Sequence, residues 1–115
     1  MIESYDFGVM VVNGKRYNHD LIIFPERIMD NWWRKEGHKL TVKDLDEVLA
    51  YTPKPEFFIF GTGYYGLVKV SPEVKQILET KGIEFIAKPT KEASEVFNKL
   101  LKLKKRVIGA FHLTC

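Results

Sequence analysis

Cysteine, long apolar runs and amide side chains are all scarce in this chain of 115 residues. The single cysteine, Cys115, excludes an internal disulfide framework and suits a reducing compartment. No apolar run approaches the roughly 18 residues that a membrane-spanning helix needs. The opening residues, MIESYDFG, resemble neither a signal peptide nor a transit peptide. We therefore expect a cytoplasmic protein with no membrane partner. The few amides beside many Lys and Glu suit a heat-adapted source.

The composition indicates a folded globule, because 45% of the residues are hydrophobic and 13% are aromatic. A chain of this length fits one domain, which we expect to span residues 1–115. The net charge is +3, and the excess lies in residues 91–106, where six Lys and Arg face two Glu. Most of these cations fall at an expected helix end, where they favour the negative end of the helix dipole. Nucleic acid is the less favoured explanation of this cluster.

The first third of the chain favours β-structure. Residues 5–12 are rich in aromatic and β-branched types, and Asn13-Gly14 is a strong signal for a tight hairpin turn. Residues 15–24 resume a strand that ends before Pro25. Residues 25–40 follow neither the helical nor the strand period, so we expect a long irregular connection with room for a short helical turn over 28–34.

From Thr41 onward the pattern predicts alternating helices and strands. Each expected helix has an apolar face and a start signal, and these signals are Thr41 with Asp44, Ser71-Pro72, and Pro89-Thr90. The intervening apolar runs predict strands over 56–60, 83–87 and 106–111. Strand–helix–strand connections favour parallel strands. We expect an α/β fold with these three strands at the centre of a mixed sheet, flanking helices, and the N-terminal hairpin extending or covering the sheet.

A glycine-rich segment, Gly61-Thr62-Gly63-Tyr64-Tyr65-Gly66, follows the first of these strands. It matches G-x-G-x-x-G, but the next helix start comes five residues later, so the geometry of a dinucleotide site is not met. Ligands of open α/β sheets bind at the carboxyl ends of strands. Gly61, Thr62, Gly63, Tyr64 and His112 are therefore our candidates for binding an anionic small molecule, if the last strand lies parallel to and near the strand at 56–60. The alternative is a purely conformational role for the glycines.

Two adjacent tryptophans, Trp32 and Trp33, precede Arg34 and His38 in the irregular connection. We expect one tryptophan in the core and the other partly exposed. Large amphipathic rings beside an arginine often anchor interfaces. Trp32, Trp33, Arg34 and His38 are therefore our candidates for contacting a protein partner.

Nothing specific in the sequence indicates catalysis, a cofactor or a metal. His19, His38 and His112 have no metal-ligand spacing to one another. We name no catalytic residue, and enzyme activity stays open, with a non-catalytic role favoured. At the chain end, we expect His112 to bond the backbone and Cys115 to pack as a small apolar residue. The alternative is a ligand-facing or redox role for this pair.

Several short segments together resemble a known family. They are W-W-x-x-x-G-H at 32–38, G-T-G at 61–63, K-G-I-E at 81–84 and F-H-L-T-C at 111–115. In their order and spacing, the chain resembles the Mth-type domain family, whose activity is unassigned. The resemblance covers nearly the whole chain and implies a three-layer α/β fold with a five-stranded mixed sheet. It implies no established activity, cofactor or catalytic residue.

The family includes an adipogenesis-associated protein and a mitochondrial assembly factor for respiratory complex I, which suggests work through protein–protein contacts. Our leading hypothesis is a non-catalytic binding or assembly module with an unidentified protein partner. Homodimerisation stays open. The competing hypothesis is an anionic-ligand site beside Gly61–Gly66.

Overall fold

The structure is a computed structural model that describes residues 1–115. Its strands are β1 (Ile2–Asp6), β2 (Val9–Val12), β3 (Lys15–Tyr17), β4 (Leu21–Ile23), β5 (Ile28–Asp30), β6 (Lys39–Leu40), β7 (Phe57–Gly61), β8 (Lys69–Val70), β9 (Glu84–Lys88) and β10 (Val107–Phe111). Its helices are the 3-10 helix η1 (Val42–Leu45) and the α-helices α1 (Asp46–Ala50), α2 (Pro72–Thr80) and α3 (Thr90–Lys102).

The central sheet has five strands in the order β5-β4-β10-β7-β9. β10 and β9 run parallel to β7, whereas β4 runs antiparallel to β10 and β5 antiparallel to β4. The expected mixed five-stranded sheet is confirmed. β1, β2 and β3 form a separate antiparallel sheet, and β6 pairs with β8 in a short two-stranded sheet.

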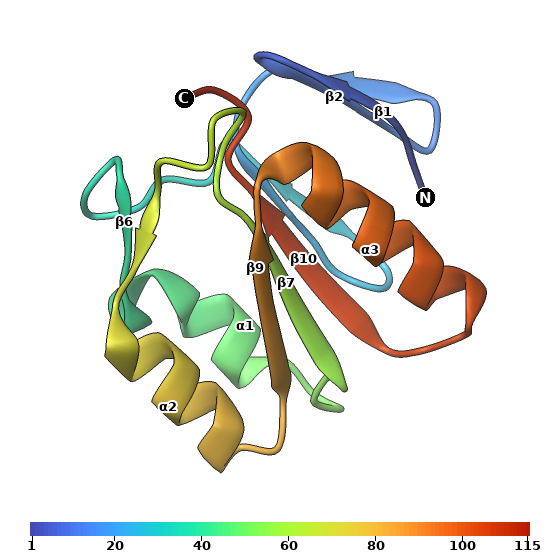
Figure 1. The fold of residues 1–115 in the computed structure, drawn as a ribbon. Helices are drawn as coiled ribbons and strands as arrows, with labels where there is room; N and C mark the ends of the chain where they lie inside the picture. The colour runs from blue at the N-terminus through green and yellow to red at the C-terminus, as the bar shows by residue number, and fades with distance from the viewer.

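The fold has three layers, because both faces of the central sheet are covered (Figure 1). Phe58 and Ile108 point to the face that carries α1 and α2. Ile59 and Phe111, with the opposite strand parity, point to the face that carries α3 and the N-terminal sheet. β7 and β10 are buried on both faces, which explains their nearly continuous apolar sequences.

The predicted start signals of the helices are confirmed. The Asp44 carboxylate accepts a bond from the backbone N–H of Thr41, so it satisfies a donor at the start of η1. Ser71 is the N-cap of α2 and Pro72 its first residue. α2 ends before Gly82, whose φ of +75° is the left-handed conformation that glycine favours.

The N-terminal third contains more strands than we predicted. Residues 5–12 form two strands, because the chain reverses at Gly8 with a φ of +77°. The hairpin at Asn13-Gly14 is confirmed and joins β2 to β3. The expected strand at 15–24 divides into β3, in the N-terminal sheet, and β4, in the central sheet. The polar residues 18–20 form the connection between β3 and β4, in which the chain passes from the N-terminal sheet to the central sheet.

The connection at 25–40 is not irregular throughout, and the expected helical turn over 28–34 is wrong. The chain reverses after β4, where the N–H of Phe24 donates to the carbonyl of Arg27, and returns as β5. Residues 39–40 form β6. A strand of three residues is too short to show a period in sequence, so β5 could not be recognised from its pattern.

The strand at 83–87 is also misplaced by our prediction, because β9 forms an edge of the sheet and β10 occupies the centre. Phe85 and Ile86 are apolar because α2 and α3 cover the two faces of this edge. Such a strand looks like a central one in sequence. No helix here combines the length and the apolar character required to cross a bilayer.

Candidate functional site

The carboxyl ends of the parallel strands β7, β9 and β10 lie at the same end of the sheet, and several loops meet there (Figure 1). The segment after β10, the segment before β4 and the segment after β5 together surround a hollow of about 430 Å³. Twelve residues line it: Asn18, His19, Asp20, Asn31, Trp32, Trp33, Arg34, Gly37, His38, His112, Thr114 and Cys115. The volume lies within the range of ligand sites, about 300–1,000 Å³.

A buried polar cluster of Asp20, Arg34 and His112 forms one wall of this hollow. Asp20 Oδ2 accepts a bond from Arg34 Nη1 at 2.8 Å and lies 2.7 Å from His112 Nδ1. Asp20 Oδ1 accepts the backbone N–H of Leu113 at 2.9 Å. The side chains of Arg34, His112 and Asp20 are only 4%, 9% and 16% exposed. One carboxylate therefore joins the last segment of the chain to the segment after β5.

The electrostatics of the cluster favour an ionised Asp20. Burial alone would raise its pKa, but the bonds from His112, from the backbone of Leu113 and from Arg34 outweigh burial and lower the pKa below its ordinary value. Arg34 Nη2 also donates to the carbonyl of Gly37. Arg34 Nε is buried and has no partner within the chain. Most of the arginine's charge is thus compensated internally.

Asp20 and Arg34 together hold the imidazole ring of His112 in place. Asp20 Oδ2 lies 2.7 Å from His112 Nδ1, and Arg34 Nη2 lies 3.0 Å from the same nitrogen. The nearest hydroxyl, Thr114 Oγ1, lies 3.5 Å from Nε2. That distance exceeds the roughly 2.6–3.2 Å over which a base takes a proton directly. The arrangement orients an imidazole but does not hold an activated nucleophile.

All three histidines of the chain and its only cysteine line this one hollow, although they are far apart in sequence. The rings of His38 and His112 meet edge to face, with centroids 6.2 Å apart. No group of three or more His, Cys, Asp or Glu side chains has the geometry of a metal site. Cys115 is exposed, so the expectation that it packs as an apolar residue is wrong. The His112 ring bonds Asp20 rather than the backbone we expected.

The condition we set for a site beside the glycine-rich segment is met, because β10 lies next to β7 and parallel to it. Its backbone donors, however, are already used. The N–H groups of Thr62, Gly63 and Tyr64 donate to the carbonyl of Lys88, the hydroxyl of Thr90 and the carbonyl of Thr114. An anion cradle built from these groups is therefore not available in this conformation.

The glycines instead let two segments approach closely. A Cβ on Gly61 would lie 2.8 Å from Thr90 Oγ1. Gly63 has a φ of +109°, and a Cβ there would lie 2.9 Å from both His112 Cδ2 and the carbonyl oxygen of Thr114. These contacts support the conformational alternative, in which the loop seats the chain end.

The structure therefore combines our two candidate sets in an unexpected way. All four candidates for partner contact, Trp32, Trp33, Arg34 and His38, line the hollow together with His112. The other ligand candidates, residues 61–64, lie outside the lining. The expected division of the tryptophans is confirmed, since Trp32 is 5% exposed and Trp33 is 78% exposed.

Asp20 is the central residue that our sequence reasoning missed. The available signal was the polar interruption Asn18-His19-Asp20 within an otherwise β-rich run. We treated residues 15–24 as one strand, which hid it. A charged residue between two strands on neighbouring sheets is well placed to pair with distant segments.

An exposed aromatic patch, formed by Phe7, Tyr64 and Tyr65, lies beside this end of the sheet. The ring centroids of Phe7 and Tyr64 are 5.5 Å apart, and those of Tyr64 and Tyr65 are 5.0 Å apart. Each of the three side chains is substantially exposed, and so is Leu67, two residues after Tyr65. The chain end connects the patch to the hollow, because Tyr64 bonds Thr114 and Thr114 lines the hollow with Trp33.

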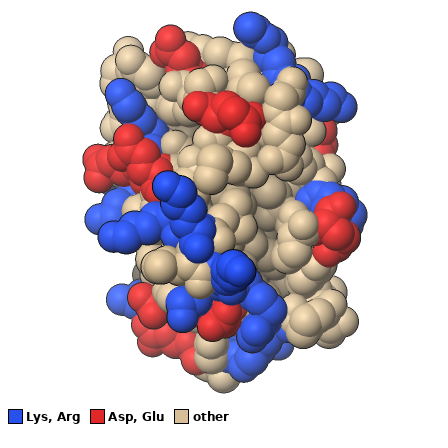
Figure 2. All heavy atoms as spheres, turned by 90° about the vertical axis from the view of Figure 1, so that its right-hand side faces the viewer, with Lys and Arg blue, Asp and Glu red and all other residues tan.

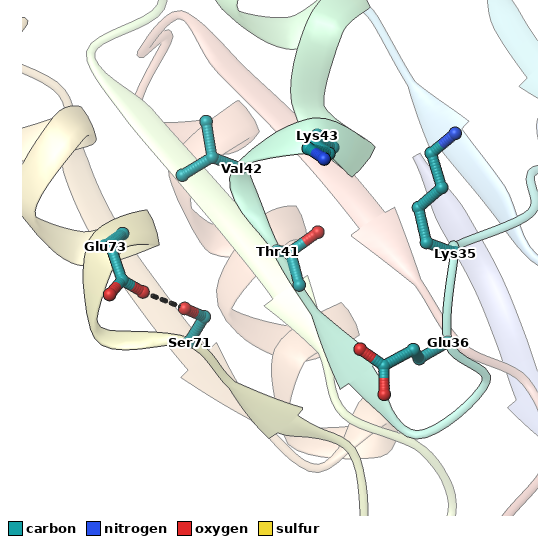
Figure 3. A pocket seen from close by; sticks show the side chains of 7 residues that line it. All are labelled: Lys35, Glu36, Thr41, Val42, Lys43, Ser71 and Glu73. Atoms are coloured by element: carbon teal, nitrogen blue, oxygen red, sulfur yellow. Dashed lines mark hydrogen bonds between the residues drawn. The ribbon is translucent and has the colours of Figure 1, made fainter.

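A second hollow of about 520 Å³ lies between the starts of η1 and α2 (Figure 3). Its lining holds two lysines, Lys35 and Lys43, and two glutamates, Glu36 and Glu73. The one bond drawn among these residues joins the Ser71 hydroxyl to the Glu73 carboxylate. That bond already places a negative charge at the start of α2, and none of our predicted site residues lies here. This hollow has no feature that selects a ligand.

The basic residues of 91–106 gather toward the end of α3, where Lys99 and Lys102 lie in the last turn, at the negative end of the helix dipole. Figure 2 shows Lys and Arg side chains over the lower part of this face of the molecule, with Asp and Glu side chains among them. The mixture of signs resembles a solvated surface more than a track for a polyanion.

Comparisons with known proteins agree with this fold. A family model described as "Protein of unknown function (DUF498/DUF598)" matches residues 2–112. The conserved hypothetical protein PH1505 from Pyrococcus horikoshii OT3 has a similar solved structure. It is 33% identical, the match covers 100% of this chain and 99% of that one, and the TM-score is 0.82.

Two more distant structures share the fold. A protein named MT938 is 24% identical over 100% of this chain and 98% of its own, with a TM-score of 0.82. A Bordetella pertussis protein described as a Mth938-like domain is 21% identical over 98% of this chain and 85% of its own, with a TM-score of 0.73. None of these names carries an activity.

Proposed function

The chain belongs to the DUF498/DUF598 family of proteins of unknown function, the Mth938-like domains, and from that premise we propose that it is a non-catalytic protein-binding module of the cytoplasm. The docking surface that we propose comprises the aromatic patch of Phe7, Tyr64 and Tyr65 together with the exposed Leu67 and Trp33. The observation that carries the proposal is the exposure of these large side chains at one end of a well-packed fold, with Trp33 at 78% and Tyr65 at 65%.

The physical chemistry of the patch supports a protein partner. Contiguous exposed apolar surface is unusual on a protein that acts alone and often marks an interaction site. Tyrosine and tryptophan combine a large apolar area with a polar group, and they dominate the binding energy of many interfaces. The matching partner surface presents apolar side chains at its centre and hydrogen-bond acceptors for the tyrosine hydroxyls.

The rigidity of the support favours the same conclusion. Thr90 Oγ1 accepts the N–H of Gly63 at 2.8 Å, and its hydroxyl donates to the carbonyl of His112 at 2.6 Å. These bonds are buried and hold the loop of Tyr64 and Tyr65 against the chain end. A preformed loop loses little conformational entropy on binding.

Photo-crosslinking in the native cell tests the proposal directly. A photoreactive phenylalanine analogue is placed at Tyr65, at Trp33 and, as a matched control, at Leu103, an exposed apolar residue after α3. We expect one and the same protein to crosslink from positions 65 and 33 and not from 103. With that protein purified, Tyr65→Ala should weaken binding about 30-fold, which is typical of an interface hot spot.

The opposite results are equally clear. Adducts at 65 and 33 no stronger than at 103 contradict the proposal. A purified partner whose binding is unchanged by Tyr65→Ala, while a thermal melt shows the variant folded, also contradicts it.

The second candidate function is the binding of a small anionic molecule in the hollow. The specific observation is the buried Arg34 Nε, a charged donor with no partner within the chain. A carboxylate or phosphate oxygen in the hollow would supply that partner, with His38 and Trp33 as further contacts.

A thermal-shift screen with carboxylates, phosphates and nucleotides tests this candidate. A ligand that binds only the folded chain stabilises it by about 2.7 kcal/mol at 100 times its Kd. A rise in melting temperature of corresponding size, lost in Trp33→Ala and kept in Tyr65→Ala, would favour ligand binding in the hollow. If no member of the panel shifts the melting temperature, small-anion binding is contradicted and protein binding is the one proposal that remains.

A further inference from the structure

The free edge of the central sheet has an unusual sequence. β9 pairs with β7 on one side only, and Figure 1 shows no segment in front of its other side. Its five residues read Glu-Phe-Ile-Ala-Lys. A free edge presents unpaired backbone groups and is a ready template for another strand.

The outward-facing backbone groups of β9 follow from its pairing with β7. The N–H of Glu84 donates to the carbonyl of Glu56, and the carbonyl of Lys88 accepts the N–H of Thr62, so residues 84 and 88 bond toward β7. In a parallel pair, alternate residues face the neighbour. The N–H and C=O groups of Phe85 and Ala87 therefore face outward.

An antiparallel second copy of β9 matches these groups when the two-fold axis passes beside Ile86. Phe85 then stands opposite Ala87 of the second copy, and each such pair exchanges both of its backbone hydrogen bonds. The same register places Glu84 opposite Lys88 of the second copy, and Lys88 opposite Glu84. The outward-facing backbone groups and the Glu84–Lys88 charge pairs therefore both favour this same register.

The side chains fit this register on both faces. Glu84, Ile86 and Lys88 share the face that carries α3, so opposite charges flank an Ile–Ile contact. On the other face, the large ring of Phe85 stands beside the small Ala87. Neither Glu84 nor Lys88 forms an ion pair within the chain. Both charges are free to pair across the edge.

From this complementarity we propose that β9 is a self-association edge, through which two copies of this chain join their sheets into one continuous ten-stranded sheet. The occupant is a second copy rather than an unrelated strand, because the edge is complementary to itself. The opposite edge, β5, lacks the property: its three residues, Ile-Met-Asp, carry one sign of charge only. The proposal concerns a surface separate from the aromatic patch and does not depend on it.

Charge-swap variants give a sharp test by light scattering and sedimentation. The unmodified chain should have twice its monomer mass of 13.4 kDa at high concentration. Glu84→Lys and Lys88→Glu each replace both attractive pairs by repulsive ones, so we expect the Kd to rise about 30-fold in each. The double variant, Glu84→Lys with Lys88→Glu, restores both pairs and should dimerise like the unmodified chain.

Mixing the two single variants adds a test that no general loss of folding can imitate. One variant has lysine at both positions and the other glutamate at both, so the mixture should form heterodimers at concentrations at which each variant alone dimerises weakly. Glu47→Lys, an exposed change of the same charge on α1, is the control and should leave the Kd unchanged.

Three outcomes overturn the proposal. The chain could stay monomeric up to about 1 mM. It could dimerise with the same Kd in all charge variants, which would place the contact elsewhere, for example at β5. The single variants could also fail to combine into heterodimers while thermal melts show both folded.

Discussion

Removing the Asp20 carboxylate should strongly destabilise the fold. We expect Asp20→Ala to lower the free energy of unfolding at pH 7 by about 3 kcal/mol, because it leaves the charge of Arg34 buried without its partner. The N–H of Leu113 and Nδ1 of His112 lose their acceptor at the same time. The value is at the low end for a broken buried pair because Asp20 keeps 16% exposure. It corresponds to about 12 °C in Tm for a chain of this length.

A double-mutant cycle separates the charge from the lost hydrogen bonds. Arg34→Met removes the buried charge and keeps an apolar stem near Trp32, over whose ring the guanidinium carbon now lies at 5.2 Å. We therefore expect Asp20→Ala and Arg34→Met together to cost about 2 kcal/mol less than the sum of the single changes.

Urea titration followed by tryptophan fluorescence measures these values, since Trp32 is buried and changes environment on unfolding. Asp30→Ala is the matched control, because that aspartate is exposed and forms no ion pair, and we expect a change within about 0.5 kcal/mol. A cost below about 1 kcal/mol for Asp20→Ala, or strict additivity in the cycle, would refute the reasoning.

Three further predictions concern the same end of the fold. Because the pKa of Asp20 is lower in the folded than in the unfolded state, where it is near 3.8, its ionisation stabilises the fold at neutral pH. The difference in free energy of unfolding between the unmodified chain and Asp20→Asn should therefore be constant at neutral pH and shrink as the pH falls through the folded pKa. An undiminished difference at about pH 2 contradicts this. Gly63→Ala should lower the free energy of unfolding by about 2 kcal/mol in urea titration, whereas Gly37→Ala, whose added Cβ meets nothing within 4 Å, should leave it nearly unchanged. Equal losses in the two variants would be incompatible with a steric role for Gly63. Iodoacetamide should label the exposed Cys115 about as fast as free cysteine, with no change in His112→Ala, and a much faster reaction that His112→Ala slows would reveal an activated thiol.

The helices and the longer strands could be predicted because their signals are local. The apolar runs of β7 and β10 reflect burial on both faces, and Ser71-Pro72 marks the start of α2 within a few residues. β5 gave no such signal, because three residues show no period. The position of β9 could not be predicted either, since an edge strand covered by helices on both faces is as apolar as a central one.

The candidate site was only partly predictable for a different reason. Trp33 and Arg34 stood out by residue type, which does not depend on the fold. Asp20 matters because β10 enters the sheet beside β4 and brings His112 and Leu113 to it. That adjacency joins residues that are 92 and 93 positions apart and is a property of sheet order, which local patterns do not encode.

The central position of β10 has a consequence for synthesis on the ribosome. β4 and β7 both pair with β10 and not with each other, so the sheet stays in two separate halves until residues 107–111 have emerged. At about 5–20 residues per second, the nascent chain exposes the apolar edges of both halves for several seconds. Folding therefore cannot be completed progressively from the N-terminus. Pairing between the two halves of the sheet therefore waits until β10 has been made.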